Sequence, residues 1–206
     1  MFAYVKDGSI VSMPNSNKGI QSGDLKYPKS IYTLWTEAER KAIGVYTIEI
    51  DETNKIDEEY YINTNITYAF GSGKVTGTYG TATARPHADT KWTQAQIDDP
   101  SLVGQAPEGA DTNTVRLEGL KTLKKNELDN QCASILAPSD WRVTKAQETG
   151  DAMDSGWKTW RGNVRTKCNS MQTQIDNAAD TAALQTLFTY TGDPATRPLG
   201  EFPIKE

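Results

Sequence analysis

The sequence predicts an α+β protein, with a β-hairpin-rich N-terminal half joined by a Pro/Gly-rich linker to a C-terminal α-helical hairpin domain. Three patterns support this fold class. Residues 60–70 alternate apolar and polar side chains with a period of two, which is typical of a β-strand. Residues 157–178 carry apolar side chains at spacings of three and four, which indicates an amphipathic helix. Residues 85–112, in between, have three prolines and no periodicity, so they predict the linker.

Residues 1–51 predict a hairpin, a short helix and a strand. Asp7 and Gly8 lie between two short apolar runs, and this pair favours the positive φ angles of a tight hairpin turn. Thr36 and Glu39 have the spacing of a capping box, and Gly44 is placed to end the helix that follows it. Residues 45–50 then predict a strand. Residues 15–30 are rich in Asn, Ser, Gly and Lys, which is typical of a loop.

Residues 56–84 predict one long β-hairpin with a turn at 71–73. Gly77 and Gly80 are expected to weaken its second strand. A hairpin of this kind is rarely stable alone in water. The apolar face of its first strand is too large for the short strands nearby to cover, so we expect it to contact another protein. The candidate partner-binding residues on this face are Tyr60, Ile62, Ile66, Tyr68 and Phe70.

The last third of the chain predicts helices. We expect a long amphipathic helix that begins at Asn113 and is stopped by Pro138. Three further helices are expected over 139–150, 157–178 and 180–188. Gly192 and the three prolines after residue 190 predict an extended tail. The predicted organisation is therefore a β-rich attachment domain over 1–84, a linker over 85–112, a helical domain over 113–190 and a tail over 191–206.

Composition excludes several classes of function. The net charge of -5 is spread evenly and leaves no basic stripe, so we expect no nucleic-acid partner. No apolar run approaches the ~18 residues of a membrane span, so we expect no membrane insertion. Cys132, Cys168 and His87 are too few for a zinc site of about four Cys and His ligands, and we expect no metal or other cofactor. The two cysteines are expected to be reduced and buried.

The sequence also predicts that the protein is not an enzyme. A catalytic triad would depend on His87, which lies in the expected linker. Glycoside hydrolysis needs two carboxyl groups that face the same bond. The acidic pairs at 58–59 and 98–99 are adjacent in sequence, and adjacent side chains on a strand point to opposite faces.

Short motifs in the C-terminal part resemble a helical domain of tailed-bacteriophage tail proteins, including tail-fibre assembly proteins. They comprise Ser139-Asp140-Trp141, Glu148-Thr149-Gly150, Trp160-Arg161 and Val164-Arg165. Trp160 stands where tyrosine is more usual in that domain. The N-terminal hairpin, Tyr27-Pro28, Leu34-Trp35 and Gly44-Val45-Tyr46 resemble the opening of such proteins, so the resemblance covers residues 1–50 and 130–190. By itself it favours an assembly chaperone. The long hairpin over 56–84 is suited to strand addition on another protein, and this favours a non-enzymatic component of the virion tail. Such a protein is made in the host cytoplasm and binds a tail fibre or baseplate protein, in multiple copies within a symmetric assembly. Two alternatives stay open: an assembly chaperone absent from the mature particle, and a host-glycan-binding module.

The motif residues also have structural interpretations. Asp140 is expected to accept hydrogen bonds from the first turn of its helix, and Gly150 to end that helix. Trp141, Trp157 and Trp160 are expected to pack inward. Arg161 and Arg165 lie four residues apart on one helix face, where they either hold Asp140 or Glu148 or bind an acidic patch on a partner.

Overall fold

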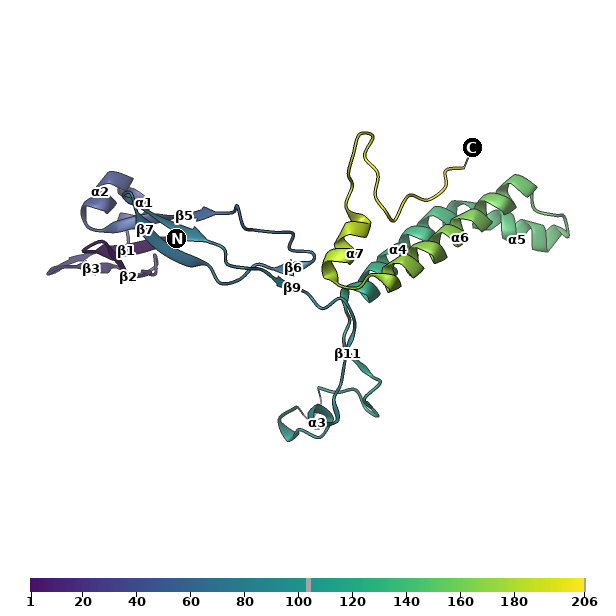
Figure 1. The fold of residues 1–206 in the computed structure, drawn as a ribbon, viewed down its shortest axis with the longest axis horizontal. Helices are drawn as coiled ribbons and strands as arrows, with labels where there is room; N and C mark the ends of the chain where they lie inside the picture. Colours follow the sequence, from purple (N-terminus) through teal and green to yellow (C-terminus); the bar gives the residue numbers. More distant parts are fainter. Residues whose placement is uncertain (103–104, 206) are drawn as a thin grey trace. The chain divides into compact units, whose positions relative to one another are not determined.

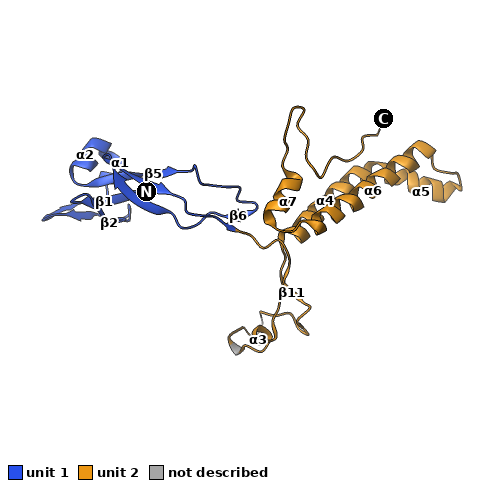
Figure 2. Ribbon diagram, viewed as in Figure 1, with its two compact units in different colours: residues 1–83 blue, residues 84–206 orange. Residues whose placement is uncertain are grey.

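The computed structural model describes residues 1–102 and 105–205 and divides into two compact units, 1–83 and 84–206 (Figure 2). The α+β class is confirmed, because the five-stranded sheet lies in the first unit and the long helices lie in the second (Figure 1). Each unit is described by itself below.

The first unit is built on a sheet of five strands in the order β2-β1-β5-β8-β7. The strands are β1 (Phe2–Lys6), β2 (Ser9–Ser12), β5 (Val45–Asp51), β7 (Thr67–Gly71) and β8 (Lys74–Thr78). The predicted hairpin is confirmed, with β1 antiparallel to β2 and positive φ angles at Asp7 and Gly8. β5 and β8 pair in parallel, a contact between segments far apart in the chain. Ala3, Val5, Ile48 and Val75 form the buried core of this sheet.

Local capping chemistry is confirmed in the same unit. The side chain of Thr36 accepts from the backbone N–H of Glu39, and Glu39 reaches back to Thr36, at the start of α2 (Glu37–Ala42). Gly44 follows with a φ of 83°, and a Cβ there would lie 2.5 Å from the carbonyl oxygen of Val5. Only glycine satisfies both conditions, so this position fixes the step from α2 into β5.

The loop predicted over 15–30 is wrong. This segment contains a second hairpin, β3 (Ile20–Ser22) and β4 (Leu25–Tyr27), and α1 (Ile31–Leu34) follows it. Gly23 takes the positive φ of the turn. Ile20, Ile31, Tyr32 and Val45 form a second buried cluster. The strands of this hairpin are three residues long, too short to show a period of two, and this explains why the sequence hides them.

The long strand predicted over 60–70 is also wrong. Asn65 has a φ of 60°, and it separates β6 (Tyr61–Ile62) from β7. Tyr68 and Phe70 then pack against the sheet core, Tyr60 is separately buried, and Ile62 is exposed. The predicted single apolar face therefore does not form. The predicted turn and antiparallel pairing are confirmed for β7 and β8. β8 lies inside the sheet between β5 and β7, so this hairpin is part of the fold, with β7 at the sheet edge.

Gly77 of β8 has a packing role that the sequence did not indicate. It is buried, and a Cβ there would lie 2.9 Å from side-chain carbons of both Ile50 and Tyr68. The absent side chain gives these two neighbours the space to cover the strand. Gly77 is therefore an adaptation to close packing and not merely a weak point in the strand.

Much of the predicted linker is folded. β9 (Thr83–Ala84) precedes it, and β10 (Thr90–Lys91) pairs with β11 (Val115–Leu117). Between the paired strands lie α3 (Gln94–Ile97) and a short 3-10 helix (Pro100–Leu102). Trp92 is buried, with the guanidinium carbon of Arg116 5.1 Å from its ring centroid. Because β11 occupies 115–117, the helix predicted from Asn113 starts only at Leu120.

The second unit is dominated by two long helices, α4 (Leu120–Leu136) and α6 (Ser155–Asn177), which lie side by side (Figure 1). α4 ends at Leu136, which confirms the stop predicted from Pro138. A 3-10 helix (Ala137–Ser139) then leads into α5 (Asp140–Thr149). The last helix is α7 (Thr181–Phe188). The predicted apolar stripe of α6 is confirmed as core over most of its length. Its buried members are Val164, Cys168, Met171 and Ile175.

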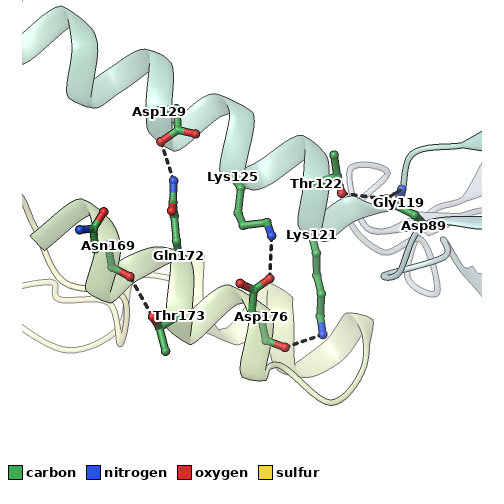
Figure 3. Close-up of polar contacts among 10 residues, drawn as sticks. All are labelled: Asp89, Gly119, Lys121, Thr122, Lys125, Asp129, Asn169, Gln172, Thr173 and Asp176. Carbon is green, nitrogen blue, oxygen red and sulfur yellow. Dashed lines mark hydrogen bonds and ion pairs between the residues drawn. The ribbon is translucent and has the colours of Figure 1, made fainter. Parts of the chain in front are cut away.

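Polar contacts fix the register of α4 against α6 (Figure 3). Gln172 donates to Asp129 at 2.5 Å, and Lys125 pairs with Asp176 at 2.7 Å. Asp89 replaces the missing side-chain cap of α4, whose N-cap is Gly119: it accepts from the Gly119 N–H and from the Thr122 hydroxyl, both at 2.7 Å. These two hydrogen bonds hold the pKa of Asp89 below its usual value.

The tail predicted as extended folds back onto the helices. Leu199 is fully buried, and its N–H donates to the carbonyl of Leu187. Lys167 of α6 donates to the Leu199 carbonyl at 2.8 Å, and the Trp160 indole donates to the Pro203 carbonyl at 2.9 Å. Contacts within the chain therefore hold this segment against the helices.

Candidate interaction site

Ser139 and Asp140 lie at the corner where α4 passes into α5, and Arg161 of α6 holds this corner together. Arg161 is 4% exposed. One terminal nitrogen donates to the carbonyl of Leu136 at 2.9 Å and to the hydroxyl of Ser139, and the other pairs with Asp140 at 2.5 Å. The predicted contact between Arg161 and Asp140 is confirmed. The predicted capping by Asp140 is wrong, because its carboxylate binds Arg161 and no side-chain cap is present.

Arg165 does not share the role of Arg161. It lies one helical turn farther along α6 and is exposed, as is Glu148. Within the part of the chain that the structure describes, neither side chain forms an ion pair. The predicted contact between them is therefore absent from that part. Gly150 has a φ of 75° and ends α5, so the predicted helix stop is confirmed.

The three tryptophans are less buried than predicted. Trp141 is 55% exposed, and Trp157 and Trp160 are half-buried. The rings of Trp157 and Trp160 meet edge to face with centroids 5.5 Å apart. Trp141 faces outward because α5 buries none of its residues, so this helix has no core side for the ring to join.

Arg142 is the site residue that the sequence reasoning missed. Its guanidinium carbon lies 4.5 Å from the ring centroid of Trp141 and 4.3 Å from that of Trp157. The ammonium of Lys205 lies 5.3 Å from the Trp157 centroid. These distances are typical of cation–π contacts. Arg142 and Lys145 are three residues apart on α5, and this shared helix face is the signal that could have found them.

A cleft of about 290 Å³ opens beside this aromatic and cationic cluster. Arg142 and Lys145 line it from α5, and Asp151 and Asp154 line it from the loop before α6. The remaining lining residues are Trp141, Ala146, Thr149, Ala152 and Met153. Asp154 caps α6 by accepting from the N–H of Trp157 at 3.1 Å. With the rest of the described chain, the side chains of Arg142 and Lys145 make no hydrogen bond or ion pair.

The cleft, and not the predicted hairpin face, is thus the candidate site of this protein. Of the five hairpin residues, Tyr68 and Phe70 pack against the sheet core, and Ile66 is half-buried beside Gly77. Tyr60 is buried, and Ile62 is exposed, so the five do not share one exposed face. Over residues 1–102 and 105–205 there is no cluster of three or more side chains suited to hold a metal ion.

Comparison of the chain with protein-family models, curated proteins and solved structures finds no match. The described helices include none with the length and apolar character needed to cross a bilayer.

Proposed function

We propose that this chain is a non-enzymatic component of a bacteriophage tail, which binds a tail-fibre or baseplate protein and helps to attach or assemble it. The single observation that carries this proposal is the exposed Trp141 beside the cations Arg142 and Lys145. These residues follow directly on the Ser139-Asp140 pair, within the segment that resembles tail proteins. The α5 end of the helical unit is the proposed contact with the partner.

An exposed tryptophan of this kind needs an explanation. Trp141 is 55% exposed, so water contacts much of its apolar surface. Trp and Arg are the residues most enriched among the few that carry the affinity of protein interfaces. A partner that covers Trp141 would remove that surface from water, and this supports a protein-binding role.

The corner beneath the site supports the same role. Ser139 is 1% exposed and Arg161 is 4% exposed, and together they tie α5 to α4 and α6. A rigid support of this kind lowers the entropy that a binding surface loses when it engages its partner. The site is therefore presented in a fixed geometry before contact.

Quantitative mass spectrometry of purified particles of the encoding phage, with and without disruption of the tail fibres, tests the proposal. We expect the chain in a fixed stoichiometric ratio to tail proteins, and its loss together with the disrupted fibres. Absence from intact particles would refute a structural role. If fibres then failed to assemble without the chain, the assembly-chaperone alternative would replace the proposal.

A further inference from the structure

We propose that the cleft between α5 and the start of α6 recognises an acidic residue in an extended peptide segment of the partner protein. Arg142 and Lys145 would bind the carboxylate, and Trp141 would contact an apolar neighbour of that residue. This inference deepens the proposed function and rests on it only for the partner being a tail protein.

The first support is the unpaired charge on one wall. Arg142 and Lys145 line the same cleft from one face of α5, and neither forms an ion pair with the rest of the described chain. By contrast, Arg161 of the same unit pairs with Asp140, and Lys125 pairs with Asp176. Two neighbouring cations without an internal partner complement an anionic ligand.

The second support is the state of the Arg142 guanidinium. Its guanidinium carbon lies 4.5 Å and 4.3 Å from the ring centroids of Trp141 and Trp157, and its side-chain N–H groups bond to no other described residue. N–H groups of a guanidinium match the two oxygens of a carboxylate in a bidentate pair. Contacts with two rings restrict the arginine side chain before binding, so less of its entropy is lost when a ligand binds.

The opposite wall favours a peptide over a free anion. Asp154 already accepts from the N–H of Trp157, while Asp151 is exposed. These carboxylates would repel a small anion or a polyanion. A peptide supplies backbone N–H donors next to its acidic side chain, and such donors suit the carboxylate of Asp151. The cleft volume of about 290 Å³ lies near the lower end of the ~300–1,000 Å³ usual for ligand sites, which fits one or two side chains.

The test is a titration of the full chain, isotopically labelled at nitrogen, with two matched probe peptides. These are acetyl-Leu-Glu-Leu-amide and acetyl-Leu-Gln-Leu-amide, which differ only in the carboxylate. The indole N–H signals of the five tryptophans report the site. We expect the Glu peptide to shift those of Trp141 and Trp157 and to leave those of Trp35 and Trp92 in place. Because the Gln peptide lacks the charge-assisted pair, its affinity should be at least about tenfold lower than that of the Glu peptide.

Matched variants complete the experiment. Arg142→Gln should abolish the difference between the two peptides. Lys18→Gln removes an equal charge from an exposed position of the first unit and should leave the difference unchanged. Equal binding of both peptides by the unmodified chain, or no shift at Trp141 and Trp157, would overturn the inference. Stronger shifts with a neutral monosaccharide would also overturn it, in favour of a glycan site.

The outcome is distinguishable from that of the proposed function. If the unmodified chain is absent from purified particles, the tail role fails whatever the peptides show. If the chain is present but does not select the Glu peptide, only the carboxylate inference fails. Arg142→Gln in the phage should reduce the amount of chain retained per particle, and Lys18→Gln should not. Equal retention of the two variants would count against use of the cleft in attachment.

Discussion

Replacing Arg161 by methionine should destabilise the helical unit by about 2–3 kcal/mol. The arginine makes two charge-assisted hydrogen bonds to buried acceptors, Leu136 O and Ser139 Oγ. Each is worth at least ~1.5 kcal/mol. The ion pair with Asp140 adds at most ~1 kcal/mol, because the Asp140 side chain is 61% exposed and solvent screens the pair. Methionine offsets roughly 1 kcal/mol of this loss of stability, because no charge then has to be buried.

The assay is thermal unfolding followed by the helical circular dichroism signal, which reports mainly on the second unit, where α4 and α6 lie. For a unit of about 120 residues, 1 kcal/mol corresponds to a shift of ~3–5 °C in Tm, so Arg161→Met should melt about 6–15 °C lower. Arg165→Met is the control at an exposed position and should stay within ~0.5 kcal/mol of the unmodified chain.

Two results would refute this reasoning. A Tm of Arg161→Met within about 2 °C of the unmodified chain would mean that the corner hydrogen bonds contribute no net stability. An equal loss in Asp140→Asn would mean that the ion pair, and not the bonds to Leu136 and Ser139, carries the effect. We expect Asp140→Asn to cost at most ~1 kcal/mol.

Three further predictions concern other parts of the chain. Gly77→Ala should lower the free energy of unfolding by about 1–3 kcal/mol in a denaturant titration, because the added methyl group meets side chains of the sheet. The control Gly71→Ala places its methyl group with no atom within 4 Å and should lower it less. An equal loss of stability in the two variants would contradict the packing argument. Burial and the neighbouring Cys132 raise the pKa of the Cys168 thiol from 9.0 to about 12. As pH rises, the thiol of the unfolded chain therefore ionises first, so its contribution to stability is complete below pH 9 and declines toward pH 12. Cys168→Ala should reduce this decline in thermal melts at successive pH values. An unchanged decline would show that other groups cause it. Trp141→Ala should change Tm by less than ~4 °C because the ring is 55% exposed, and a large loss of Tm would instead place the ring in the core. If the chain has the proposed tail role, this variant should also be retained less in particles.

The parts of the fold that depend on neighbouring residues could be predicted from the sequence. The capping box at Thr36 and Glu39 spans three residues, and the turn at Asp7 and Gly8 spans two, so their chemistry is complete within the local chain. The stripe of α6 could be predicted because a 23-residue helix repeats its pattern several times. Each of these elements follows from propensity and spacing alone.

The parts of the fold that were not predicted from the sequence depend on contacts between distant segments or on a single dihedral angle. The parallel pairing of β5 and β8 joins residues that the sequence gives no reason to connect. The alternation over 60–70 continues through Asn65, but its positive φ breaks the strand there, a conformation that Asn tolerates better than most residues. β10 is only two residues long, which is too short for any periodicity to indicate.

The sequence did not predict the candidate site, for a related reason. A tryptophan after a helix start predicts burial only if another element covers that face of the helix. Here no residue of α5 is buried, so Trp141 and Arg142 remain near the surface and contact each other. The resemblance located the segment, but the structure was needed to place Arg142 between two rings and beside a cleft.

Adjacent residues of one motif therefore carry two separable tasks. Ser139 is buried and bound to Arg161, while Trp141, two residues later, faces solvent. Arg161 has its hydrogen-bonding partners inside the chain, whereas the side-chain N–H groups of Arg142 bond to no other described residue. A change at Arg161 should then lower stability and attachment together, because the corner supports the site. A change at Arg142 should lower attachment while Tm stays the same. If both variants affected stability alike, the corner and the cleft would be one structural element, and the exposed cations would need no partner to explain them.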